Sequence, residues 1–321
     1  MSQQVIWVRR GGGPQEGTGA KSTRGADQPF GVRRVRVLKE VDSRMENLPP
    51  FPTVLTELVG LTKSDTSAAD DLRRCIEKDA VLTARILKLA NSAFYSPTVP
   101  VASVQQAVVM LGFLSVRSLA MAAATLKFLG ADLHAYGIFP GGLWMHSYAT
   151  AELAREFARE AKEDQDGQDA VYVGGLLHDI GKIVLGPILE GLIRDPSEEP
   201  RPEEAAAIVD WERRVADLNH CDVGGRLAEK WRLAPVTAAS VRHHHAPGGA
   251  DPSTIRAVRL VGLANLAAHR LGVGFREAAV NEAGETAMLE ALGISGERYL
   301  EITGGYTEKV ENVRDLFTGL K

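Results

Sequence analysis

Gly174-Gly-Leu-Leu-His-Asp-Ile-Gly-Lys182 places His178 and Asp179 side by side at the end of an apolar helical segment. A neighbouring imidazole and carboxylate can hold a divalent ion, and the carboxylate can bridge two ions. The pair alone is weak evidence for a metal site. Its meaning depends on which other residues the fold brings near it.

Apolar residues on both sides of this stretch recur at helical spacing. From residue 48 onward they are separated mostly by three or four positions, and no alternating pattern typical of a strand is present. Asp79 is placed to cap the helix that follows it. The sequence therefore predicts an all-α protein, with helices at 67–77, 81–90, 104–111, 114–128 and 143–161 and a loop at 165–168.

Further histidines occur on separate predicted helices. His146 shares a helix face with Leu153 and Phe157, and His220 shares one with Leu227 and Trp231, so both point toward the core. Burying an unpaired polar group costs roughly 1–3 kcal/mol, so buried imidazoles must share partners or a metal. The candidate cluster comprises His146, His178, Asp179, His220, His244 and His245.

Each member of this cluster also has a simpler interpretation. His146 or His220 alone would be an ordinary hydrogen-bonded histidine, and residues 243–245 would form an exposed helix end. Lys182 would be a surface residue after a glycine break. The metal hypothesis rests on the whole set occurring with the His-Asp pair.

Composition restricts the classes of protein to consider. The chain has 321 residues and a formal charge of −4, which is too balanced for a protein that coats nucleic acid. Cys75 and Cys221 are the only cysteines, so no disulfide framework is possible and a reducing compartment is expected. No export signal or membrane-spanning segment is predicted, because polar residues and prolines interrupt the apolar runs. We therefore expect a cytoplasmic protein.

The two ends of the chain differ from its middle. Residues 1–40 contain seven glycines and carry a net charge of +5, which predicts a flexible basic tail. An anion-binding arm is the alternative, favoured only by Arg33-Arg34-Val-Arg36. Residues 276–321 are expected to form a helical extension without an assigned function.

Several ordered motifs resemble those of the HDOD domain. The N-terminal half is similar in Leu48-Pro-Pro-Phe-Pro52, residues 76–95 and residues 107–112. The C-terminal half, which is related to HD-superfamily phosphohydrolases, is similar in Leu143-Trp-Met-His-Ser147, residues 175–182, His220-Cys-Asp-Val-Gly224 and Arg242-His-His-His-Ala-Pro247. The resemblance implies a two-part helical domain over residues 41–275, with halves at 41–135 and 136–275, that acts in bacterial signal transduction.

The cyclic-di-GMP phosphodiesterase branch of the HD superfamily offers a template for the site. By this resemblance His146, His178 and Asp179 would bind one metal, whereas Asp179, His220, His244 and His245 would bind a second. Asp179 and Lys182 would be the catalytic pair, with Lys182 facing phosphate. A ligand set rich in imidazole favours manganese, iron or zinc over magnesium.

Two departures from that template matter. Asn265 stands where the branch has a metal-binding aspartate, which weakens the first metal site. The Gly-Tyr-Pro segment of the branch is absent, and residues 247–251 replace it. We therefore expect about one metal ion per chain and little turnover of cyclic di-GMP.

Three hypotheses follow. The first is a metal-binding regulatory module that contacts a signalling protein partner. The alternative is a metal-dependent phosphohydrolase of nucleotides or cyclic dinucleotides, which would use the ligands above. Nucleic-acid binding through the basic tail is the third and the least favoured.

Overall fold

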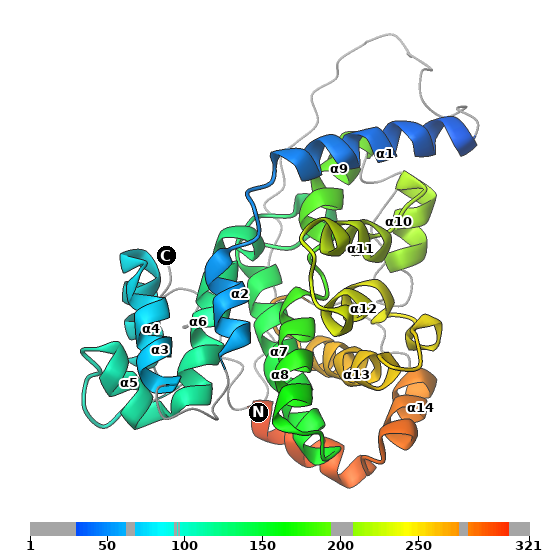
Figure 1. The fold of residues 1–321 in the computed structure, drawn as a ribbon. Coiled ribbons are helices and arrows are strands. Elements are labelled where there is room, and N and C mark those ends of the chain that lie inside the picture. The colour runs from blue at the N-terminus through cyan, green and yellow to red at the C-terminus, as the bar shows by residue number, and fades with distance from the viewer. Residues whose placement is uncertain are drawn as a thin grey trace, which may run out of the picture.

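The computed structural model describes residues 30–61, 68–92, 95, 97–193, 208–275 and 282–307, and the regular secondary structure of this part of the chain is helical. Within it there is no strand, and the sole β pairing is an isolated bridge between Leu133 and Ile138. The predicted all-α class is confirmed. The helices form two groups joined through α6 and α7, with α1 lying across the second group (Figure 1).

The N-terminal group comprises α2 (Thr53–Gly60), α3 (Ala68–Glu77), α4 (Ala80–Ala90), α5 (Val104–Leu111) and α6 (Phe113–Leu129). Local signals explain the helix boundaries. The Asp79 side chain accepts hydrogen bonds from the backbone N–H groups of Val81 and Leu82, which caps α4 as predicted. Gly112 separates α5 from α6 at a φ of 86°, a conformation that favours glycine.

The C-terminal group comprises α7 (Gly142–Glu160), α8 (Gln165–Leu177), α9 (Lys182–Leu192), α10 (Ile208–Ala216), α11 (His220–Lys230), α12 (Pro235–His243) and α13 (Ile255–Leu271). Short 3₁₀ turns, η1 (His134–Tyr136) and η3 (Pro247–Gly249), connect some of them. The central helix is α7, which packs on α8 and α13 and is buried over most of its length. This group carries every residue of the predicted metal cluster.

Side chains cross the junction between the two groups. The Trp144 indole N–H of α7 donates to the Ala122 carbonyl of α6 at 2.8 Å. The Arg117 guanidinium of α6 is buried, pairs with Asp169 of α8 and also donates to the Leu61 carbonyl. A buried charge needs such partners, so this contact ties the groups together. These contacts join the two groups of helices through α6, α7 and α8.

Part of the segment predicted as a flexible tail is helical. Residues 1–29 lie outside the described residues, but residues 30–40, which were assigned to the tail, form the first part of α1 (Phe30–Asn47). Val37, Val41 and Met45 recur every four positions and are buried. The high charge and glycine content of the segment obscured this amphipathic pattern.

The loop predicted at 165–168 is also wrong. The Asp164 side chain accepts a hydrogen bond from the Gly167 backbone N–H and caps α8, which begins at Gln165. In the C-terminal extension, α14 (Glu282–Leu292) and residues 296–307 are helical, whereas 276–281 and 308–321 lie outside the described residues.

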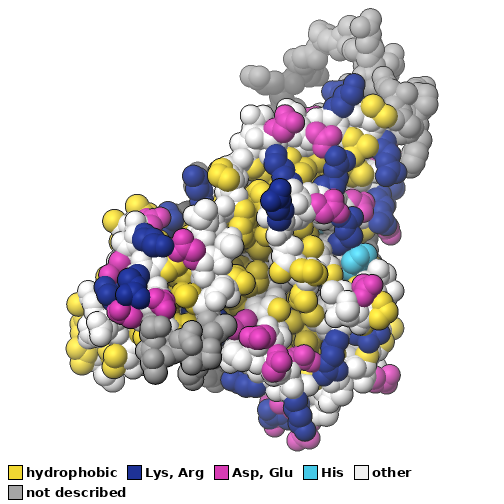
Figure 2. All heavy atoms as spheres, in the orientation of Figure 1, with side chains coloured by type: hydrophobic (Ala, Val, Ile, Leu, Met, Phe, Trp, Pro, Cys, Tyr) yellow, Lys and Arg dark blue, Asp and Glu magenta, His cyan; other side chains and the backbone are white. Residues whose placement is uncertain are grey.

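One stretch of the described chain, Gln165–Leu192, passes the length and composition test for a membrane span, with a mean hydropathy of 1.2. Most of its apolar window, 83%, is buried inside the protein, as expected for a core segment. On the face shown in Figure 2, basic and acidic side chains are interspersed. That face shows no extended surface of one sign of charge.

Candidate metal centre

The predicted site residues converge at the centre of the C-terminal group. His146 comes from the middle of α7, and the His178-Asp179 pair lies in the turn between α8 and α9. Lys182 begins α9, His220 begins α11, His244 and His245 follow α12, and Asn265 lies on α13.

The local sequence fixes His220 at the start of its helix. The Asn219 side chain accepts from the Asp222 backbone N–H, and Asp222 accepts in turn from the Asn219 N–H, which makes a capping box. The first residue of α11 is therefore held in place at the edge of the cluster, with its side chain fully buried.

The carboxylate of Asp179 lies between two groups of imidazoles. Its Oδ1 is 3.3 Å from the Nε2 of His220 and 3.6 Å from the Nε2 of His244. Its Oδ2 is 3.4 Å from the Nε2 of His178, 4.0 Å from the Nε2 of His146 and 2.8 Å from the Nζ of Lys182. The two oxygens thus face the two ligand sets that the family resemblance implies.

Hydrogen bonds on the outer side of the rings orient three of the histidines. Nδ1 of His178 donates to the Gly175 carbonyl at 2.7 Å, and Nδ1 of His244 donates to the Ser240 carbonyl at 3.0 Å. Nδ1 of His220 lies 2.8 Å from a carboxylate oxygen of Glu212. Because Nδ1 carries the proton in each ring, the Nε2 atoms turn toward Asp179 as potential metal ligands.

Several of these inward atoms have no hydrogen-bond partner. Nε2 of His178, Oδ1 of Asp179 and Nε2 of His245 are all buried and unsatisfied. The Nε2 atoms of His220 and His244 lie only 3.3 Å apart. Nitrogen lone pairs and a carboxylate oxygen this close repel one another unless a proton or a metal ion lies among them. The donor set therefore fits a divalent metal ion.

The protonation of the histidines supports this conclusion. Burial lowers the pKa of His244 to about 4 and holds the pKa values of His146 and His245 well below their usual range. These rings are neutral near pH 7, as metal ligands must be. Burial also opposes charge on His220, but the neighbouring Cys221 and Glu212 raise its pKa well above the usual range. A metal and the Nε2 proton of His220 therefore compete for one position.

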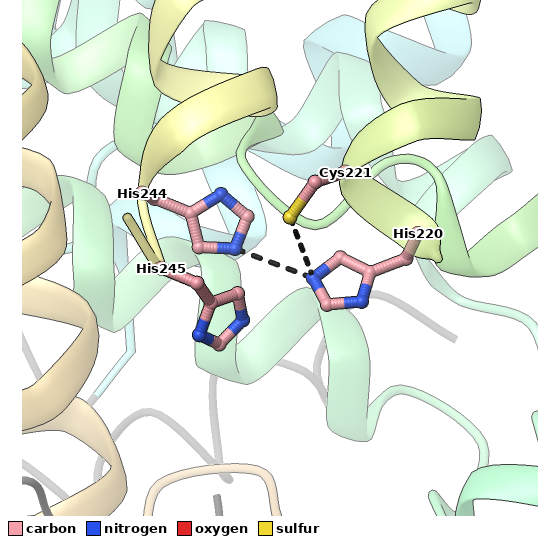
Figure 3. Close-up of side chains that lie close together, drawn as sticks. All are labelled: His220, Cys221, His244 and His245. Carbon is pink, nitrogen blue, oxygen red and sulfur yellow. Dashed lines mark hydrogen bonds between the residues drawn. The ribbon is translucent and has the colours of Figure 1, made fainter. Parts of the chain in front are cut away.

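Four potential ligands gather on one side of the cluster (Figure 3). His220, Cys221, His244 and His245 each bring a ligand atom within 4.8 Å of the others. The Cys221 Sγ lies 3.5 Å from the Nε2 of His220. Cys221 was not predicted as a ligand, because its position beside His220 in the sequence did not show that its thiol turns toward the same cluster.

Sequence reasoning also missed Glu212, which supports His220 from behind. Both oxygens of its buried carboxylate accept from His220, at the ring Nδ1 and at the backbone N–H, and the Tyr136 hydroxyl donates to it at 2.6 Å. A charged residue on the apolar face of α10, beside Trp211 and Val215, was the available signal. A carboxylate in this position orients the imidazole and makes it a stronger ligand.

His269 is a further residue that was not singled out. Its ring stacks on that of His146 with centroids 4.2 Å apart, and it is buried. It comes from α13, one turn beyond Asn265. The cluster is therefore larger than the motifs alone suggested.

A cavity of about 770 Å³ opens beside Cys221, His244 and His245. Its walls include His244, His245 and Asn265, and its charged lining comprises Arg213, Arg242 and Arg259 together with Asp210 and Asp222. This volume is typical of small-molecule sites. A metal held by His244 and His245 would thus be reachable by a small molecule from this cavity.

The chain is thus an all-helical protein with a buried His-Asp cluster whose ligand atoms could hold a metal ion. The comparison with protein families is specific, because the HDOD domain model matches residues 48–247. The chain belongs to the HDOD family.

Known proteins give a consistent comparison. An HDOD domain protein with unknown function from Geobacter sulfurreducens has 24% sequence identity and a TM-score of 0.71, covering 90% of this chain and 98% of its own. A protein from Shewanella amazonensis SB2B, named as a candidate phosphohydrolase, has 19% identity and a TM-score of 0.62, covering 88% of this chain and 98% of its own. These similarities show the fold.

An uncharacterized protein of Treponema pallidum (strain Nichols) is 24% identical over 218 residues. The match covers 67% of this chain and 40% of that protein, so the chain spans less than half of that relative's length.

Proposed function

We propose that this protein is a signal-transduction protein whose HD-like half binds one divalent transition metal and serves as a regulatory module for a protein partner in the cytoplasm. The observation that carries the metal proposal is the convergence of Asp179, His220, His244 and His245, in which Oδ1 of Asp179 and Nε2 of His245 have no hydrogen-bond partner. Manganese, iron or zinc suits this nitrogen-rich set, and the nearby Cys221 thiol adds weight to zinc or iron.

The chain's own residues give the centre its rigidity. Glu212 holds the ring of His220, and backbone carbonyls hold His178 and His244, so little reorganisation is needed when an ion binds. Membership of the HDOD family supports a regulatory role. The complete burial of His146 and His178 also supports it, because it leaves a substrate no access to them. Binding would release the extra proton of His220, so metal affinity should fall as the pH is lowered.

Metal content tests the proposal. Protein purified without a polyhistidine tag and without added metal should contain about one transition-metal ion per chain by elemental analysis. His220→Ala should remove most of it, because the ligand that faces both His244 and Asp179 is lost. Glu212→Gln should weaken affinity by roughly 10–100-fold while the number of sites stays the same.

His134→Ala is the matched control, because His134 is exposed and lies outside the cluster. Its metal content should equal that of wild type. A wild-type protein that carries no metal, and takes up none in titrations with manganese, iron or zinc, would show that the ligand assignment is wrong.

A second candidate function is metal-dependent phosphohydrolysis, favoured by the cavity that joins the ligands His244 and His245 to three arginines. A bound divalent ion supplies an activated water and neutralises phosphate charge. Arg213, Arg242 and Arg259 would then hold the anionic substrate. Lys182, predicted to face phosphate, is fully buried beside Asp179. It is not one of the described residues that line this cavity.

Turnover decides between the two functions. We expect the metal-loaded wild type to hydrolyse cyclic di-GMP and a panel of nucleotides at or near the background rate, because Asn265 replaces a charged ligand. Phosphate release should be measured for wild type and for Asp179→Ala in parallel. Clear wild-type turnover that disappears in Asp179→Ala would establish the phosphohydrolase.

A further inference from the structure

The ammonium group of Lys182 lies beside the Asp179 oxygen that the first metal of a two-metal centre would use. Its Nζ is 2.8 Å from Oδ2 of Asp179, and both side chains are almost completely buried, at 0% and 1% exposed. A charge this deep is stable only with a close partner of opposite sign. The ion pair therefore belongs to the interior of the site.

Two aromatic rings support the ammonium from other sides. Nζ lies 4.8 Å from the ring centroid of Phe275 and 5.7 Å from that of Tyr136. Ring faces at these distances attract a cation. Lys182 also begins α9, three residues after Asp179, so the backbone fixes the pair in register.

A second ligand of the first group is also engaged. The Nε2 atom of His146, which faces Asp179, lies 2.8 Å from Oδ1 of Asn265 and donates its proton to that oxygen. A nitrogen that carries a proton cannot ligate a metal. Asn265 thus has two effects. It lacks the negative charge of the aspartate expected at this position, and it keeps His146 in the tautomer whose Nε2 atom carries the proton.

The first set of ligand atoms (His146, His178 and Oδ2 of Asp179) consequently differs from the second set (Oδ1 of Asp179, His220, His244 and His245). Proximity alone would let His146, His178 and Asp179 hold an ion, since their ligand atoms lie within 4.8 Å of one another. In this group, however, Oδ2 of Asp179 accepts from Lys182, and His146 is committed to Asn265. Only Nε2 of His178 is without a hydrogen-bond partner in this set, whereas in the second set both Oδ1 of Asp179 and Nε2 of His245 have none.

We propose that the centre is mononuclear by construction, with the Lys182 ammonium in place of the first metal ion and the Asn265 amide keeping His146 out of coordination. The proposal rests on the function proposed above and specifies its metal site. Asp179 would then neutralise an ammonium on one oxygen and share a divalent ion on the other. A further divalent ion beside Nζ would meet strong repulsion at low dielectric.

Four proteins test this proposal: wild type, Lys182→Met, Asn265→Asp and the double variant. Methionine matches the lysine stem in length and removes the charge, whereas aspartate restores a carboxylate next to His146. After loading with Mn²⁺ and removal of excess, elemental analysis should give about one ion for wild type and each single variant. The double variant should hold about two.

Lys127→Met combined with Asn265→Asp is the matched control, because Lys127 is exposed on α6 and lies outside the cluster. It should hold one ion. Electron paramagnetic resonance of Mn²⁺-loaded wild type gives an independent reading that needs no variant. The spectrum should be that of isolated Mn²⁺, without the features of a spin-coupled pair.

Three results would overturn the proposal: a spin-coupled pair in wild type, two ions in Asn265→Asp alone, or no gain of an ion in a folded double variant. Failure of the proposed metal function has a different signature. If the second group binds nothing, wild type contains no ion, yet the double variant should still gain one.

Discussion

Gly181→Ala is expected to lower the free energy of unfolding by at least about 3 kcal/mol and to abolish metal binding. A Cβ atom at position 181 would lie 1.9 Å from the backbone oxygen of His220 and 2.7 Å from the backbone nitrogen of Gly224. Both are main-chain atoms of α11, so no side-chain rotation relieves the clash. The turn that carries Asp179 and the helix that carries His220 would have to separate.

Gly191→Ala provides the control for this prediction. Gly191 lies on α9, the helix that begins directly after Gly181, and a Cβ atom there would meet nothing within 4 Å. Alanine should leave the stability unchanged or raise it by up to about 1 kcal/mol. Urea unfolding and metal titration of both variants make the comparison. Wild-type stability and metal binding in Gly181→Ala would contradict the close approach of α9 and α11.

Metal-free protein should lose much of its stability between pH 7 and pH 5. Burial lowers the pKa of His244 to about 4 and that of His269 to about 3, against an ordinary value of 6.5. A histidine whose pKa is lowered on folding stabilises the protein above pH 6.5, and this contribution is lost as the pH falls toward the folded value. Each of these two residues should cost about 2 kcal/mol at pH 5.

The pKa shifts of the other cluster residues also change the stability of the protein as the pH falls. The pKa values of His146 and His245 are also lowered, which adds to the acid sensitivity, whereas the raised pKa of His220 offsets part of it. The pKa of Asp179 is lowered by Lys182 and His178 despite burial, so its contribution is lost only below about pH 4. The net result between pH 6.5 and pH 5 is destabilisation.

Urea unfolding at several pH values in a chelator measures this effect. His269→Phe should reduce the acid sensitivity by about 2 kcal/mol, because an apolar ring replaces one that must stay neutral. His134→Phe should leave the profile unchanged, since the side chain of His134 is 77% exposed. Equal stability of wild type at pH 7 and pH 5 would show that the imidazoles are not buried as described.

Much of the fold could be predicted because its helices carry strong local signals. The segments predicted at 104–111 and 114–128 match α5 and α6 to within a residue. The prediction was wrong where residues typical of loops concealed a helical pattern. Glycines and charges masked the buried face of α1, and the polar run at 165–168 contained a helix start capped by Asp164.

The candidate site was predictable only where motifs marked it. The histidines of the cluster recur in ordered motifs, so sequence alone indicated them. Glu212 and His269 lie in no motif that was singled out, and they join the site through contacts across the fold. The pairing of Lys182 with Asp179 depends on side-chain direction and burial, which one sequence does not reveal.

Helix α1 gives the region before residue 48 a mechanical link to the centre. The HDOD match begins at residue 48, yet α1 ends at Asn47 and packs on α9 and α10, while its last turn accepts a hydrogen bond from Lys230 of α11. These three helices carry Lys182, Glu212 and His220. A displacement of α1 would therefore be transmitted to the helices that position the metal ligands. A protein truncated at residue 48 would lack this connection.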